Sequence, residues 1–290
     1  MKPRLTLITI AVALMGGAAN LDAQELSVPA TPYMGGPVEL VEAPNGAIAN
    51  KRILDGIDEV AWTQPTIEKP VEGIWVFGGY GLAPISIIDT DEGLIAFDTG
   101  DTKHDGELLL EAIRTVSDKP IKAIIYGHSH TVFGAGVLAE GSEDIPIIGH
   151  PNLNSVVETN MKAAGAPAYF QELGPYLTAR ALIQFNAFMP KEGPDALVVP
   201  TTLPENFDMA FLPVNTPVKD GQEMTVLGQK MQFFTKYGSD DKVHTTVWLP
   251  DRKILFTTLL WSSPPQLYSV RGDVFRDPRE WIEGLKFNRN

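Results

Sequence analysis

The residues best suited to chemistry in this chain are His128 and His130, in the stretch "AIIYGHSHTVFGAG". They are two of the five histidines among 290 residues, and they follow directly on an apolar run. Side chains of a strand alternate between its faces, so an H-x-H pair at a strand end points to one side. Imidazole suits zinc and similar divalent ions, which makes the pair a candidate metal site. Taken alone, two ordinary polar loop residues are an equally good interpretation.

The elements around this pair predict strands and helices in alternation, followed by a run of short strands. Strands are predicted over 73–79, on both sides of a turn at 91–93, over 121–127 and over 145–150. Helices are predicted over 105–117, with Asp105 as N-cap, and over 132–141, 152–165 and 169–189. Further strands are predicted over 209–215, 222–228, 229–237, 244–250 and 253–261, and a last helix over 277–285. The order indicates an α/β (α+β) fold with two sheets layered between helices.

Composition excludes several classes of function. The net charge is -13, and no block of basic residues interrupts the acidic ones. Nucleic acids and acidic membranes are therefore not expected partners, because both need clustered Lys and Arg. Cysteine is absent, which excludes disulfides, thiolate catalysis and thiolate metal ligands.

The N-terminus has the pattern of a secretory signal. Lys2 and Arg4 precede the apolar run "LTLITIAVALMGGAA", and small residues suited to cleavage lie near Ala23. We expect a signal peptide over 1–23, a Pro- and Gly-rich N-terminal arm over 24–72 and a domain over 73–290. A periplasmic or secreted location follows from this interpretation. The alternative is an uncleaved membrane anchor, which would be the chain's only contact with a membrane.

The run "ISIIDTDEGLIAFDTG", then a helix, then "IKAIIYGHSH" resembles the opening of the metallo-β-lactamase superfamily. Within it the chain is most similar to the alkylsulfatase branch, on "ARALIQFNAFMPKEGP", "VHTTVWLPDRKILFTTLLW" and "LYSVRGDVFRDPREWIEGL". The resemblance extends from about Gly73 to the C-terminus. It implies an αββα metallo-β-lactamase-like sandwich, a zinc cofactor, and hydrolysis of a small-molecule substrate such as an alkyl sulfate or another ester.

The chain departs from the family pattern at the second metal. The family continues H-x-H with any residue, then Asp and His, whereas this chain has Thr131, Val132 and Phe133. A bridging carboxylate of the family falls at Thr258 or Leu259, and the family's last strand, with its last histidine, has no counterpart before residue 290. The resemblance therefore implies one zinc ion and leaves the second site without ligands.

The resemblance also assigns roles outside the H-x-H pair. Asp240, in "YGSDDKVHTTVWLP", falls at the family's carboxylate ligand for the first metal, and His244 lies within reach of the same loop. An acidic turn is the alternative for this segment. Asp98 matches a residue that braces the metal loop. Arg271 matches a sulfate-contacting arginine, although a salt bridge to a nearby aspartate is an equal alternative.

Two functions remain open from the sequence. The first is an exported, metal-dependent hydrolase of the alkylsulfatase type, in which a metal-activated water attacks a sulfate ester. The second is a non-catalytic descendant of the same fold that binds at most one metal ion or a ligand. The missing Asp-His pair and the missing bridging carboxylate favour the second function.

Overall fold

A seven-stranded sheet carries an apolar core on each of its two faces. The computed structural model describes residues 38–56, 64–81, 83–142, 144–164 (160–164 by backbone alone), 189–198, 208–238, 241–259 and 277–289. The strand order is β3-β4-β5-β6-β7-β8-β9, antiparallel from β3 to β6 and parallel from β6 to β9. The bounds are β3 Thr66–Val71, β4 Ile74–Gly78, β5 Ile85–Thr90, β6 Gly93–Phe97, β7 Ile121–Ile125, β8 Ile147–Gly149 and β9 Thr216–Pro217.

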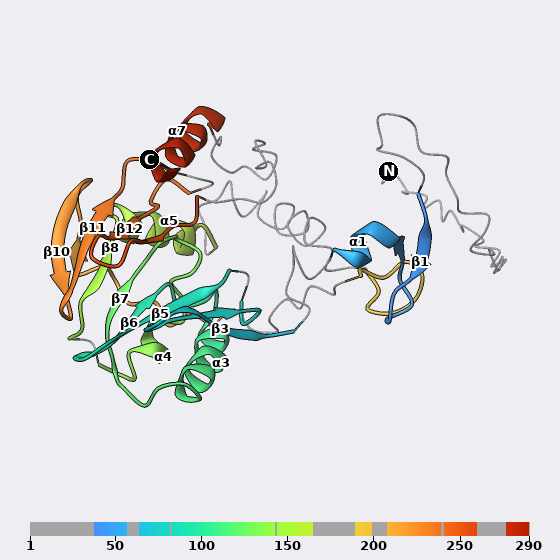
Figure 1. The fold of residues 1–290 in the computed structure, drawn as a ribbon, viewed down its shortest axis with the longest axis horizontal. Helices are drawn as coiled ribbons and strands as arrows, with labels where there is room; N and C mark the ends of the chain where they lie inside the picture. The colour runs from blue at the N-terminus through green and yellow to red at the C-terminus, as the bar shows by residue number, and fades with distance from the viewer. Residues whose placement is uncertain are drawn as a thin grey trace, which may run out of the picture.

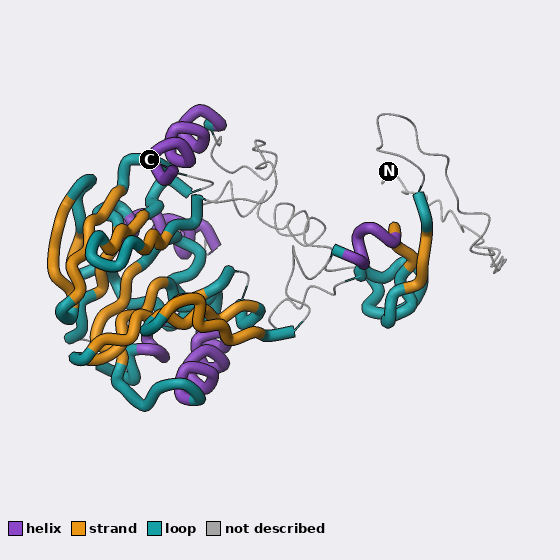
Figure 2. The backbone as a smooth tube through the Cα atoms, in the orientation of Figure 1, coloured by secondary structure: helices purple, strands orange, loops and turns teal. Residues whose placement is uncertain are grey.

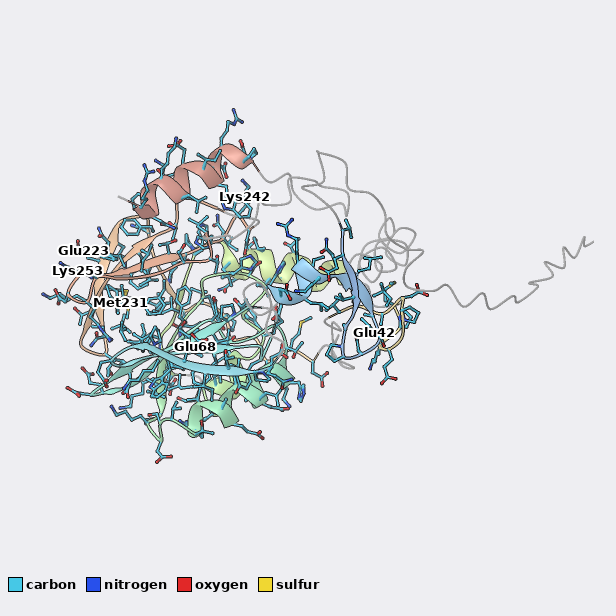
Figure 3. The ribbon with its side chains drawn as sticks, turned by 45° about the vertical axis from the view of Figure 1, so that its right-hand side comes forward. Glu42, Glu68, Glu223, Met231, Lys242 and Lys253 are labelled. Atoms are coloured by element: carbon cyan, nitrogen blue, oxygen red, sulfur yellow. The ribbon has the colours of Figure 1, made fainter. Side chains whose placement is uncertain are left out.

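A second, antiparallel sheet of four strands packs against one face of the first. Its strands are β10 Gln222–Val226, β11 Gln229–Phe234, β12 Thr246–Leu249 and β13 Ile254–Phe256, in that order across the sheet. The core between the sheets joins Ile88 and Ile95 of the large sheet to Met231 and Val247 of the small one. Figure 3 shows Met231 between the sheets, while Glu223 lies on the outside.

Helices cover the outer face of each sheet (Figures 1 and 2). The large sheet is covered by α3 Lys103–Arg114, α4 Ala135–Leu138 and α5 Leu153–Ala164, which contribute to its second core. On the small sheet lies α7 Pro278–Arg289, whose buried Trp281 donates a hydrogen bond of 3.2 Å to the Leu259 carbonyl. The helix–sheet–sheet–helix order confirms the predicted αββα sandwich.

Helix α3 begins two residues earlier than predicted. Its N-cap is Thr102, whose hydroxyl accepts a hydrogen bond of 3.0 Å from the Asp105 amide. The prediction of Asp105 as N-cap is therefore wrong. Asp105 is the third helical residue, and its carboxylate accepts a bond of 3.1 Å from the Asp101 amide, so the two side chains cap the helix from both directions.

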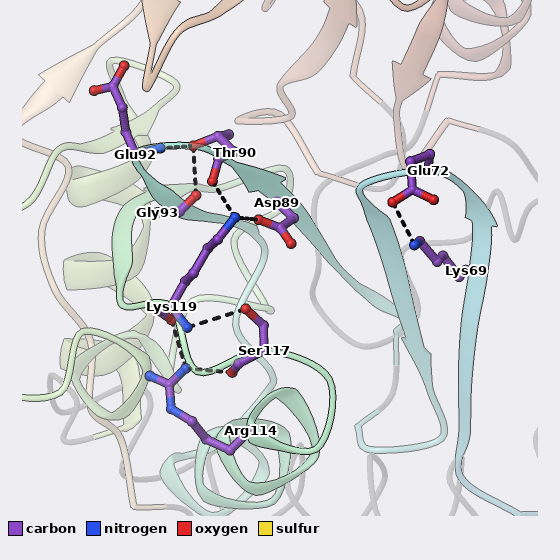
Figure 4. Close-up of polar contacts among 9 residues, drawn as sticks. All are labelled: Lys69, Glu72, Asp89, Thr90, Glu92, Gly93, Arg114, Ser117 and Lys119. Atoms are coloured by element: carbon purple, nitrogen blue, oxygen red, sulfur yellow. Dashed lines mark hydrogen bonds and ion pairs between the residues drawn. The ribbon is translucent and has the colours of Figure 1, made fainter.

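The turn from α3 into β7 is tied to β5, which lies two strands away in the sheet. Lys119 donates to the Asp89 carboxylate at 2.6 Å and to the Thr90 carbonyl at 2.8 Å (Figure 4). Arg114, at the end of α3, donates to the Ser117 and Lys119 carbonyls at 3.2 and 2.8 Å. These bonds fix where β7 enters the sheet, and hence where the residues after β7 emerge from it.

The segment before β9 is not the strand that the sequence predicted. Residues 209–215 are irregular, and strand pairing begins only at Thr216, so that prediction is wrong. The segment is held by individual bonds instead, such as those from Tyr126 Oη to the Leu212 carbonyl at 2.8 Å and from the Val214 amide to the Asn154 side chain at 2.8 Å. The predicted helix over 169–189 lies almost wholly outside the described residues.

The described residues before Gly73 form three strands and a short helix. A hairpin of β1 Leu40–Glu42 and β2 Ile48–Asn50 leads into α1 Lys51–Asp55. The hairpin turn holds residues 191–197 through Asn45, whose amide donates to the Lys191 and Leu197 carbonyls at 3.1 and 2.6 Å. Strand β3, at the edge of the large sheet, also precedes Gly73. Within the described part of the chain, no helix has the length and hydrophobicity needed to cross a bilayer.

Candidate active site

The histidine loop, residues 126–134, follows β7 at the edge where the parallel strands end. Inside it the backbone amide of His130 donates to Nδ1 of His128 at 3.1 Å. This short turn brings the two imidazoles together, with ring centroids 4.8 Å apart and planes at 61°. His128 is buried and His130 is exposed, so the pair presents one enclosed and one accessible ring.

Asp98 fixes the start of the histidine loop. It follows β6 with a backbone φ of 65°, in the left-handed region, and it is buried. Its Oδ1 accepts a hydrogen bond of 2.7 Å from the Gly127 amide. Burial raises the pKa of Asp98 to about 6, although the bond from Gly127 opposes that rise by favouring the carboxylate.

Two glycines let the histidine loop lie close to the end of β6. A Cβ on Gly127 would lie 2.6 Å from Cζ of Phe97 and 3.0 Å from Oδ2 of Asp98. A Cβ on Gly134 would lie 2.0 Å from the Thr99 carbonyl oxygen. Glycine is therefore required at Gly134, where the Cβ would meet backbone, whereas at Gly127 a Cβ would force the ring of Phe97 to shift.

Val132 and Phe133, the two residues that follow Thr131, belong to or pack against the apolar core. Val132 is 0% exposed and forms a parallel bridge with Gly100. Phe133 packs against the same core, with its ring centroid 6.4 Å from that of Phe211. The Thr99 amide and hydroxyl both donate to the Thr131 carbonyl at 2.8 Å, which holds the segment in place. These two positions therefore serve packing and supply no metal ligand.

Asp241 reaches the histidine loop from the far end of the chain. Its Oδ2 accepts a hydrogen bond of 2.6 Å from the Ser129 amide and lies 3.8 Å from Nδ1 of His128. Its Oδ1 accepts from the Val243 amide at 3.0 Å. Burial by itself would raise the pKa of Asp241, but the His128 charge and the bonds from Ser129 and Val243 outweigh it, and the pKa is lowered. One signal in the sequence pointed to this residue: Asp241 directly follows Asp240 and so lies within reach of the same loop.

His244 is enclosed by threonine hydroxyls. Its Nε2 lies 3.0 Å from Thr246 Oγ1, and its Nδ1 lies 2.6 Å from Thr258 Oγ1. Thr257 Oγ1 is 3.5 Å from the same Nε2 and accepts a bond of 3.2 Å from Asn288 of α7. Both ring nitrogens of this buried histidine are thus within hydrogen-bonding reach of hydroxyls. The sequence offered no signal for the three threonines as partners of His244.

The donor types at the histidine loop fit a zinc ion, but the described residues supply only part of a set. His128 and His130 offer two imidazoles, and both oxygens of Asp241 already accept backbone amides. No cluster of three His, Asp or Glu side chains suited to a metal occurs among the described residues. Asp240, the expected carboxylate ligand, and Arg271, the expected sulfate contact, both lie outside those residues.

The comparisons with known proteins place this chain near the alkylsulfatases. No protein-family model matches it. It is 29% identical over 204 residues to a linear primary-alkylsulfatase of Pseudomonas sp. (strain ATCC 19151), covering 69% of this chain and 38% of the relative. It is 25% identical over 218 residues to an (R)-specific secondary-alkylsulfatase of Pseudomonas sp., covering 70% of this chain and 31% of the relative.

Solved structures agree on the fold. The stereoselective inverting sec-alkylsulfatase Pisa1 from Pseudomonas sp. superimposes with a TM-score of 0.66 at 18% identity, covering 86% of this chain and 43% of that one. The chain thus spans less than half the length of these relatives.

Proposed function

We propose that this chain, which is related to the alkylsulfatases and has the metallo-β-lactamase fold, is a slow, single-metal hydrolase of alkyl sulfates or related esters. One observation carries the proposal. The imidazoles of His128 and His130 lie side by side at the carboxyl end of a central parallel strand, with ring centroids 4.8 Å apart. In α/β folds this edge is where ligands collect.

One zinc ion is the cofactor that the donor types favour, held by His128, His130 and, from its place in the sequence, Asp240. Held there, an ion would provide Lewis-acid activation of water, lowering its pKa toward about 7. The chain's own residues keep the ligands in position. Asp98 fixes the turn before His128, and Asp241 holds the amide between the two histidines. Arg271 is our candidate for the sulfate group, because guanidinium donates paired hydrogen bonds to an oxyanion.

Slow turnover is part of the proposal because no Asp-His pair that could hold a second metal follows His130 and Thr131. Val132 and Phe133 pack in the core. A second ion would share the charge that develops in the transition state, and a single-metal site lacks that contribution. We also propose that the protein is exported, on the basis of the charged and apolar residues at its N-terminus.

The experiment measures zinc content and sulfate release from decyl sulfate with the purified protein, its His128→Ala and His130→Ala variants, and His104→Ala as control. His104 is exposed on α3, and its Nδ1 lies 3.6 Å from the carboxylate of Glu107. The proposal expects zinc binding and slow sulfate release that both loop variants abolish and the control retains. Equal zinc content in the parent and all three variants would contradict a metal site at His128 and His130. Equal sulfate release by the four proteins would contradict hydrolysis at this site.

A second candidate is a non-catalytic ligand-binding protein of the same fold. It is favoured by the burial of Val132 and by the engagement of both His244 nitrogens with threonines. Saturable binding of decyl sulfate without release of sulfate, with zinc supplied, would select this candidate over the hydrolase.

A further inference from the structure

The turn between β1 and β2 contains the dipeptide Asn45-Gly46. Because glycine has no side chain, its backbone nitrogen can reach the side-chain carbon of a preceding asparagine more easily than that of any other residue. That attack converts the side-chain amide into a carboxylate, which is a change of both charge and hydrogen-bonding capacity. The contacts of Asn45 determine how fast the reaction proceeds in the folded protein and what it does to the structure.

The side chain of Asn45 joins the hairpin to residues 189–198, which lie beside it (Figure 1). Its Nδ2 donates hydrogen bonds to the carbonyls of Lys191 and Leu197 at 3.1 and 2.6 Å. Its Oδ1 accepts a bond of 3.3 Å from the Ala47 amide, which fixes the orientation of the side-chain amide. One side chain thus holds two points of the facing segment, and it does so as a hydrogen-bond donor.

The fold restrains both of the groups that would react. The Gly46 amide, whose nitrogen would attack, donates a hydrogen bond of 2.8 Å to the Ala43 carbonyl. A Cβ on Gly46 would lie 3.2 Å from the backbone nitrogen of Gly193, and the Gly193 amide donates to the Asn45 carbonyl at 2.9 Å. Attack requires the Gly46 nitrogen to lose its proton and the Asn45 side chain to leave its carbonyl partners. The reaction therefore needs the turn to open locally.

We propose that Asn45 is a site of spontaneous deamidation, and that the reaction irreversibly releases residues 189–198 from the hairpin. The Gly46 nitrogen forms a bond to Cγ of Asn45, and the side-chain nitrogen leaves as ammonia with the proton that the Gly46 nitrogen loses. Water then opens the resulting succinimide ring at either of its carbonyls, which gives aspartate or isoaspartate. Water is the co-reactant, and no electrons are exchanged with an oxidant or a reductant.

The product cannot make the bonds that hold the segment. A carboxylate donates no hydrogen bond, so the carbonyls of Lys191 and Leu197 would lose their donor and face a negative charge instead. Isoaspartate in addition lengthens the backbone by one methylene within the turn. The bond of 3.2 Å from the Ile48 amide to the Pro194 carbonyl lies outside the turn and would remain as a weaker attachment.

The first measurement follows deamidation of Asn45 by peptide mass spectrometry while the purified protein is incubated at neutral pH, either folded or in guanidinium chloride. We expect deamidation in both samples, with a rate at least about tenfold lower in the folded protein, because the turn must open first. Asn215, which precedes Thr216 rather than a glycine, is the internal control and should remain unmodified on the same time scale.

The second measurement is hydrogen exchange of residues 189–198 in the parent, in the deamidated protein separated by anion exchange, and in two variants. Exchange should be at least about tenfold faster in the deamidated protein and in Asn45→Asp than in the parent. Asn50→Asp is the matched control, because it adds the same charge to the same hairpin. Its carboxylate can still accept the bond of 3.0 Å from the Arg52 amide that caps α1, so exchange of the segment should not change.

Faster exchange in both the deamidated protein and Asn45→Asp, with Asn50→Asp like the parent, supports the proposal. Equal exchange in the parent and the deamidated protein overturns the release. Absence of deamidation at Asn45 from the folded protein after prolonged incubation overturns the modification site. The deamidated protein folds before it reacts, so it decides the question even where Asn45→Asp fails to fold. Neither measurement involves a metal ion or hydrolysis, so both outcomes are independent of the proposed function.

Discussion

The carboxylate of Asp98 and the backbone amide of Gly127 are joined by a hydrogen bond of 2.7 Å, which links the end of β6 to the end of β7. The bond is buried, and the residues that it joins are 29 apart in the chain. Because the two parallel strands end side by side, this bond sets the direction in which the histidine loop leaves the sheet.

Gly127→Ala should destabilise the protein and displace the histidine loop. The added Cβ would lie 2.6 Å from the ring of Phe97, in a packed region where overfilling costs about 1–3 kcal/mol. Chemical denaturation measures the loss. Gly56→Ala is the control, because a Cβ on Gly56 would have one neighbour, the Arg52 carbonyl oxygen at 3.5 Å. The free energy of unfolding of this variant should differ little from that of the parent. Equal effects of the two substitutions would contradict the packing argument.

Asp98→Asn should flatten the dependence of stability on pH in the chelated protein. Burial raises the pKa of Asp98 from 3.8 to about 6. The folded chain then binds the proton more tightly than the unfolded chain, so the free energy of unfolding falls as the pH rises from about 4 to about 6. Asp98 contributes at most about 3 kcal/mol to this change in the free energy of unfolding, and its contribution should vanish in Asp98→Asn.

Denaturation curves between pH 4 and 7.5 test this prediction, with Asp118→Asn as an exposed control. Parent and Asp118→Asn should show the same slope, and Asp98→Asn a smaller one. Three parallel curves would mean that Asp98 does not titrate in this range in the folded protein.

Asp241→Asn should weaken the attachment of the histidine loop to the second sheet. The carboxylate accepts amides from Ser129 and Val243, and bonds to a charged acceptor contribute about 1.5–3 kcal/mol each. The pKa of Asp241 is lowered, so its stabilising contribution is present at neutral pH and is lost as the pH falls below about 4. The difference in unfolding free energy between parent and variant should therefore shrink in acid. Asp251→Asn, an exposed carboxylate 3.5 Å from Lys230, should show almost no difference at either pH.

Val132→Asp should destabilise the protein without increasing its zinc content. Val132 is fully buried in the core, and a carboxylate there has no partner, which costs about 3–5 kcal/mol at neutral pH. Asparagine has the same size as aspartate but no charge. Val132→Asn should therefore lower the free energy of unfolding less than Val132→Asp at pH 7, and about equally at pH 4, where the buried aspartate is protonated. Zinc analysis of each protein completes the test, and a gain of metal in Val132→Asp would show that this position can face the histidines after all.

The elements of the fold were predictable where the local pattern and the packing agree. The central strands are continuous apolar runs, as buried parallel strands are, and α3 shows Leu109, Ala112 and Ile113 at helical spacing. Strand β3 gave no such signal, because five of its six residues are exposed and it includes Glu68, Lys69 and Pro70. An edge strand with little burial has no periodicity to detect.

The proximity of His128 and His130 was predictable because it depends on two residues in one turn. Their surroundings were not, because each partner comes from a distant part of the chain. Thr131 bonds with Thr99, 32 residues away, and Ser129 with Asp241, 112 residues away. The sequence also gives no indication that Val132 pairs with Gly100, since that bridge exists only once β6 and β7 lie side by side.

Both edges of the seven-stranded sheet carry a proline, Pro70 in β3 and Pro217 in β9. Proline has no amide hydrogen, so at these two positions the edge strand has no backbone donor to offer to an added strand. On β3 the charges of Glu68 and Lys69 add a further obstacle to pairing with a second molecule. The isoleucine-rich central strands therefore lie between two edge strands, β3 and β9, that are poorly suited to pairing with a further strand. We expect these features to hinder growth of the sheet from one molecule into the next, which is the step by which apolar strands aggregate.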